Sequence, residues 1–126
     1  MKRAAALLLV GGLLVAGILL AQAPRERKPK PTTITGEVVD CFCYVTMGKE
    51  KGSGPGHKQC AEMCAKGGLP LGIATDTGEI YVAFKEHKLA NADLMPYIAQ
   101  KVTVTGVVHR HRGFNVIEVQ KVEAAK

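Results

Sequence analysis

Four cysteines and a histidine between residues 41 and 64 are the side chains best suited to chemistry in this chain. The chain contains four cysteines, so this segment holds all of them. Thiolate sulfur and imidazole nitrogen bind soft and borderline metal ions. Pairs of thiols also form disulfides or act as redox couples. Three kinds of chemistry therefore compete here: metal binding, covalent cross-linking and thiol redox exchange.

The second half of this segment, residues 57–68, is expected to be a helix. It is rich in residues that favour helix, and Gly67-Gly68 supplies a stop because glycine accepts the left-handed conformation that ends a helix. His57, Cys60 and Cys64 are separated by steps of three and four residues. On a helix they lie along one stripe.

The first half of the segment is expected to close a strand. Cys41 and Cys43 are two residues apart, and on a strand such residues point in the same direction. A glycine-rich loop from Gly48 to Gly56 follows. The two pairs of thiols are therefore predicted to converge when the helix folds over the end of the sheet, and His57 can join them.

The metal-binding hypothesis uses thiolates from both pairs, with the histidine able to replace one of them. The predicted ligands are Cys41, Cys43, His57, Cys60 and Cys64. Sulfur ligands select Cu(I) or Zn(II), and an exported site favours copper over zinc. The Cys-x3-Cys spacing with a nearby histidine locally resembles the copper loops of cytochrome oxidase subunit two and of the Sco-type assembly factors, although their full ligand set is absent. That resemblance implies copper binding or delivery.

Two other hypotheses use the same cysteines. In a disulfide-stapled domain, Cys41 or Cys43 would pair with Cys60 or Cys64, because pairing within either motif is strained. In a redox protein, Cys60 and Cys64 would form the couple, with a thiolate favoured by the helix start and by His57. The Cys-x2-Cys spacing of thioredoxins is absent.

Several neighbouring residues receive simpler interpretations. Asp40 could orient a ligand but is expected to bond to a turn amide. Met47 and Met63 are soft donors, yet a core or gap-filling role is expected for each. His109 and His111 are expected at an exposed polar hairpin tip.

The rest of the chain predicts a mainly β domain. Five strands are expected, at residues 32–40, 71–75, 79–84, 101–109 and 115–122. A short helix is expected within Ala90 to Gln100, with Asn91 capping its first turn and Pro96 near its start. It lies between the third and fourth strands, and the helical Cys/His insertion, residues 41–68, lies between the first and second.

This order of elements resembles the oligonucleotide/oligosaccharide-binding (OB) fold, a five-stranded Greek-key barrel. The resemblance is to small exported bacterial OB-fold proteins, and it implies architecture without specifying chemistry. The stretches that carry it are Ile34-Thr35-Gly36-Glu37-Val38, Leu94-Met95-Pro96-Tyr97-Ile98 and Lys101-Val102-Thr103-Val104-Thr105-Gly106-Val107-Val108. The insertion departs from a plain OB domain, and function is expected there.

The N-terminal segment predicts export. Residues 1–23 combine a basic start, an apolar stretch over residues 4–20 and an Ala-Gln-Ala ending, which is the layout of a signal peptide or of a retained membrane anchor. Residues 24–31 form a linker rich in proline and charge. Residues 32–126 form the OB-like domain, expected in the periplasm or another extracytoplasmic compartment, tethered if residues 4–20 are retained.

Composition narrows the classes of partner. The 126 residues carry 17 basic and 11 acidic side chains, a mild positive balance that does not indicate nucleic-acid binding. No hydrolytic triad or phosphate-binding loop occurs, so we do not expect an enzyme. The expected partners are a protein that donates or accepts the metal and, if the anchor is retained, the membrane surface. The rival class is a ligand-binding module for an anionic glycan or peptide.

Overall fold

The computed structural model describes residues 28–126. The expected signal or anchor, residues 1–23, and the first half of the linker, residues 24–27, lie outside this range. Within it, none of the helices is long and apolar enough to cross a bilayer. The elements, in chain order, are β1 (Thr32–Asp40), α1 (Cys41–Met47), α2 (Lys49–Gly52), η1 (Pro55–His57), α3 (Lys58–Lys66), β2 (Leu71–Ala74), β3 (Ile80–Lys85), β4 (Lys88–Leu89), α4 (Asn91–Leu94), η2 (Met95–Tyr97), β5 (Lys101–His111) and β6 (Phe114–Ala124).

The chain is mainly β, as predicted, and its strands form one sheet that closes on itself. The strand order is β2-β1-β5-β6-β3-β4, and β2 also pairs with β3. Five strands therefore form a ring, with β3 and β6 parallel and the other pairs antiparallel. The prediction of five strands missed β4, a two-residue strand paired with the end of β3. The short helix consequently follows β4 rather than the third strand directly.

Strand β1 bends in the middle and pairs with two partners. Thr32 to Glu37 pair with β5, and Glu37 to Asp40 pair with β2. A Cβ on Gly36 would collide with the carbonyl oxygen of Ala74 on β2. Glycine therefore permits the close approach of β2 where β1 changes partner.

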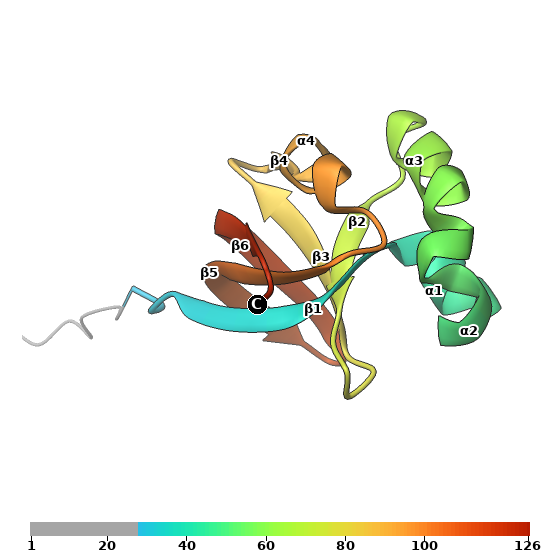
Figure 1. The fold of residues 1–126 in the computed structure, drawn as a ribbon. Coiled ribbons are helices and arrows are strands. Elements are labelled where there is room, and N and C mark those ends of the chain that lie inside the picture. Colours follow the sequence, from blue (N-terminus) through green and yellow to red (C-terminus); the bar gives the residue numbers. More distant parts are fainter. Residues whose placement is uncertain (1–27) are drawn as a thin grey trace, which may run out of the picture.

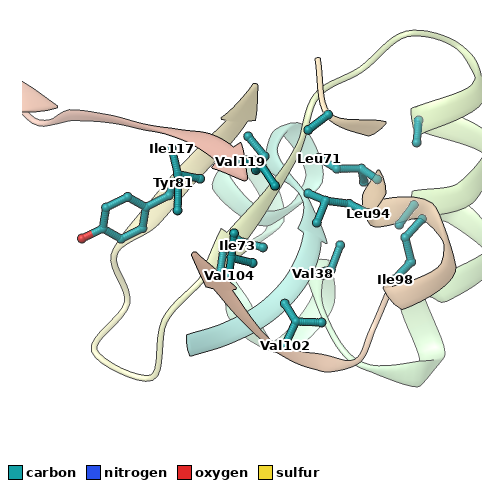
Figure 2. Packing of buried hydrophobic residues seen from close by; sticks show 14 residues of the cluster. Val38, Leu71, Ile73, Tyr81, Leu94, Ile98, Val102, Val104, Ile117 and Val119 are labelled. Carbon is teal, nitrogen blue, oxygen red and sulfur yellow. The ribbon is translucent and has the colours of Figure 1, made fainter. Parts of the chain in front are cut away.

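The core lies inside the ring and continues under two helical segments. It is formed mainly by aliphatic side chains that alternate along the strands, including Val102 and Val104 of β5. Leu94 and Ile98 close one side of it, and Ala61 and Ala65 bring α3 into the same cluster. Figure 2 shows the labelled side chains gathered between the strands and the α4 segment. Helix α3 is thus fixed to the ring by apolar packing.

The Cys/His insertion is more helical than predicted. It was expected to begin as a continuation of the first strand, but β1 ends at Asp40 and α1 begins at Cys41. The glycine-rich loop also contains a turn of helix, α2, which packs against α1. Figure 1 shows α1, α2 and α3 together at one side of the ring, beyond the end of β1.

The segment expected to be a helix within Ala90 to Gln100 contains two shorter pieces, α4 and η2. The prediction that Asn91 caps it is wrong, because the N-cap is Ala90 and Asn91 is the first helical residue. The Asn91 side chain instead accepts the Leu71 N–H and donates to the carbonyl oxygens of Ala65 and Leu69. Asn91 therefore anchors the C-terminal end of α3 to the ring.

Candidate metal centre

Three cysteine sulfurs of the insertion meet at one point. Cys43 lies on α1, while Cys60 and Cys64 lie one turn apart on α3. Their Sγ atoms lie within 4.8 Å of one another. We call these residues the sulfur group. Sulfur ligands of a tetrahedral zinc ion, with Zn–S bonds of about 2.3 Å, stand about 3.8 Å apart. The observed spacing is therefore close to that of a metal site.

A second set of donors shares Cys43. Asp40, Cys43 and His57 each offer one ligand atom, and these atoms also lie within 4.8 Å of one another. We call these three residues the mixed group, because it offers oxygen, sulfur and nitrogen. Asp40 ends β1, and His57 ends η1 and precedes the first residue of α3. The two groups together contain five residues from four elements: β1, α1, η1 and α3.

The mixed group contains two buried polar atoms without hydrogen-bond partners. Asp40 is 1% exposed and His57 is 8% exposed. Among the side chains of residues 28–126, the buried atoms lacking a partner are Asp40 Oδ2 and His57 Nε2. A buried polar group left unpaired costs about 1–3 kcal/mol, and an ion is one of the standard explanations for such groups.

Backbone contacts fix the elements that present these donors. The Asp40 side chain caps α1, where its Oδ1 accepts the N–H groups of Phe42 at 2.9 Å and Cys43 at 3.4 Å. The Gly54 N–H donates to Glu37 Oε1 at 2.5 Å, which attaches the loop before His57 to β1. These contacts hold the site to the ring from both sides of the insertion.

Burial and the Asp40 carboxylate keep the thiols protonated when no metal is bound. Burial first, and then Asp40, raises the pKa of Cys43 from the ordinary 9.0 to about 12. For Cys64 the neighbouring Asp40 carboxylate contributes most, burial comes second, and the pKa rises to about 11. A cation changes this balance, because it replaces the protons and neutralises the thiolates and the carboxylate.

Cys41 does not join its predicted partners. Residues two apart on a helix point about 200° apart, so Cys41 and Cys43 diverge on α1, and the expectation that they share a strand face is wrong. The Cys41 sulfur lies against Gly72 of β2. Cys41 also lines an apolar groove of about 500 Å³, between α1 and the β3/β6 strands, with Phe42 and Phe114. It belongs to neither donor group.

The remaining candidates lie at the surface. Met47 is 47% exposed and Met63 is 62% exposed, so the expected core role of both is wrong, because solvent reaches both side chains. His109 and His111 are exposed near the β5/β6 turn, as expected. His109 Nε2 lies 3.8 Å from Glu118 Oε2.

The sequence prediction treated Asp40 as a residue that bonds to turn amides, and the structure adds a second role. Asp40 does bond to the amides, as the cap of α1, and its carboxylate also belongs to the mixed group. An aspartate immediately before a helix is a recognised N-cap signal. Applied to Asp40, this signal would have predicted α1 and the divergence of Cys41 from Cys43.

The four cysteines all lie in the described part of the chain and are free, with no pair of sulfurs at bonding distance. Comparisons with protein-family models, curated proteins and solved structures found no match to this chain. The functional conclusion therefore rests on the geometry of the two donor groups.

Proposed function

We propose that this protein binds a soft transition-metal ion through Cys43, Cys60 and Cys64, with copper(I) as the leading metal. The observation that carries the proposal is the meeting of three sulfurs from two separate helices within 4.8 Å. Thiolates favour Cu(I) and Zn(II) over harder ions.

The expected cellular compartment supports copper over zinc and delivery over storage. Residues 1–23 have the layout of an export signal or anchor, so we place the domain outside the cytosol, in the periplasm or a similar compartment. Cys60 and Cys64 are only partly buried, so an incoming thiolate or thioether could reach the ion. We propose exchange of the ion with a donor or acceptor protein, and a membrane surface as a further partner if residues 4–20 are retained.

The scaffold we propose for this site is an OB-type barrel. The pairing order β1-β2-β3-β6-β5, closed by β1 with β5 and with β3 and β6 parallel, supports this assignment. The insertion follows β1 directly and packs back onto β1 through α3. A rigid ring then holds the site while the exposed sides of its helices remain open to a partner.

The test is anaerobic titration of the reduced, purified full chain with Cu(I), in competition with a chromogenic Cu(I) chelator. Native mass spectrometry would count the bound ions. We expect one Cu(I) per chain. Cys60→Ser should weaken the affinity by about 100-fold or more, because it removes one of three sulfur ligands.

Cys41→Ala is the matched control, since it removes a neighbouring buried thiol that lies outside both donor groups. Its Cu(I) affinity should equal that of the wild type. The proposal is overturned if the reduced chain binds neither Cu(I) nor Zn(II), or if Cys41→Ala weakens binding as much as Cys60→Ser. The stapled-domain alternative would be favoured by two results together. The protein as purified would have a lower mass than the reduced chain, by the thiol hydrogens lost in forming two disulfides, and it would take up no metal after reduction.

A further inference from the structure

The sulfur group and the mixed group share a single atom, the Cys43 sulfur. Each group is compact, because its three donor atoms lie within 4.8 Å of one another. At that limit the five residues form two groups rather than one. Cys43 therefore lies between a pair of sulfurs on one side and an oxygen and a nitrogen on the other.

One ion cannot bind all five donors in this arrangement. Zinc–ligand bonds measure about 2.0–2.3 Å, so two donors on the same ion are at most about 4.6 Å apart. No group within 4.8 Å contains all three sulfurs together with Asp40 or His57, so an ion bound to the three sulfurs is out of reach of both. An ion among the three sulfurs consequently leaves the buried Asp40 and His57 atoms without a partner.

Those two atoms are themselves the strongest indication of a second ligand. Both residues are more than nine-tenths buried, and neither Asp40 Oδ2 nor His57 Nε2 has a hydrogen-bond partner. Both residues belong to the compact group around Cys43. Oxygen, nitrogen and sulfur together suit a borderline divalent ion better than Cu(I), which prefers sulfur.

We infer that Asp40, Cys43 and His57 form a second metal position for a borderline divalent ion of the zinc type, joined to the sulfur-bound ion through the Cys43 thiolate. A thiolate can bridge because its sulfur has more than one lone pair. The inference rests on the proposed function, since Cys43 serves both positions. The centre then contains two metal positions. The softer position is formed by the sulfur group, which includes the partly exposed Cys60 and Cys64, and the harder position is formed by the buried residues of the mixed group.

The test uses the full chain loaded with one Cu(I) and then titrated with Zn²⁺ alone, with native mass spectrometry as the readout. The wild type should take up one Zn²⁺ beyond its Cu(I). Asp40→Asn keeps an oxygen that caps α1 but loses the second carboxylate oxygen, and His57→Gln loses the imidazole. Both variants should keep Cu(I) and bind the additional Zn²⁺ at least about tenfold more weakly.

His109→Gln is the control for zinc binding at an exposed histidine, and it should bind Zn²⁺ like the wild type. A chain that binds Cu(I) but no further Zn²⁺ overturns this inference and leaves the proposed function standing. Zinc uptake unchanged in both Asp40→Asn and His57→Gln also overturns it. A chain that binds neither Cu(I) nor Zn²⁺ refutes the proposed function instead, so the two failures are distinguishable.

Discussion

Asp40 accepts the backbone N–H of Cys43 through Oδ1 at 3.4 Å, while its Oδ2 is buried without a partner. One oxygen thus fixes the start of α1, and the carboxylate also belongs to the mixed group with Cys43. The carboxylate is 1% exposed, so bulk solvent does not reach it. Asp40 therefore does two things for Cys43: it fixes the backbone that carries this residue, and it places a negative charge near the thiol.

The capping role of Asp40 can be separated from its charge by two substitutions. Asp40→Ala removes the cap of α1, whereas asparagine caps helices about as well as aspartate. In the reduced, metal-free protein, Asp40→Ala should unfold at lower urea concentration than Asp40→Asn. The difference should correspond to about 1 kcal/mol. Equal midpoints would show that the two N–H bonds to Oδ1 contribute nothing to stability.

Thiol reactivity reports the protonation of the sulfur group. Asp40 and burial raise the pKa of Cys64, so its reactive thiolate is scarce near neutral pH. At pH 8, iodoacetamide should alkylate Cys64 in the folded, metal-free protein about tenfold or more slowly than in urea. Mass spectrometry of the labelled peptides measures both rates. Rapid labelling of the folded protein would instead indicate a stabilised thiolate and favour a redox role.

The buried thiol of Cys41 makes stability depend on alkaline pH. Burial first, and then the charge of Asp40, raises its pKa from 9.0 to about 12. Between these values the folded state holds more protons than the unfolded state, so the free energy of unfolding falls as pH rises. The contribution of Cys41 is complete below pH 9 and is lost as pH approaches 12. Urea midpoints of the reduced, metal-free protein from pH 8 to pH 11 should show this decline.

Cys41→Ala is the comparison for the alkaline effect. It removes one titrating thiol from the interior and should make the decline in stability above pH 9 shallower. The starting stability of the variant does not affect this comparison, because the measured quantity is the slope against pH. An identical slope in both proteins would mean that Cys41 ionises as easily in the folded state as in the unfolded state.

Much of the ring was predictable because its strands follow simple patterns. β1 has the predicted bounds, Thr32–Asp40, and the β2/β3 hairpin and the β5/β6 pair occur where alternation and turn residues predicted them. Helix α3 was also predicted, with Cys60 and Cys64 on one side. These elements have one buried face, and the spacing of apolar residues along the sequence predicts both the type of element and the buried face.

The arrangement of Cys41 and Cys43 was not predictable from the same patterns. Phenylalanine, tyrosine, valine and threonine fill the positions around them, and these residues favour strands over helices. Capping and packing override this preference, because Asp40 caps α1 and α2 packs against it. On the short helix α1, Cys41 points away from Cys43, and it therefore does not lie with the other expected ligands.

The packing of α2 on α1 predicts that metal affinity can be changed without touching a ligand. A Cβ on Gly52 would lie 2.6 Å from the carbonyl oxygen of Cys43 and 2.7 Å from the Cα of Tyr44, so Gly52→Ala must displace α1. We expect Gly52→Ala to bind Cu(I) about tenfold or more weakly than the wild type, since a small misplacement of one ligand weakens a metal site. Gly56→Ala is the matched control, because a Cβ there meets no atom within 4 Å. Chelator competition on both variants measures the effect, and equal affinities would show that the position of Cys43 does not depend on α2.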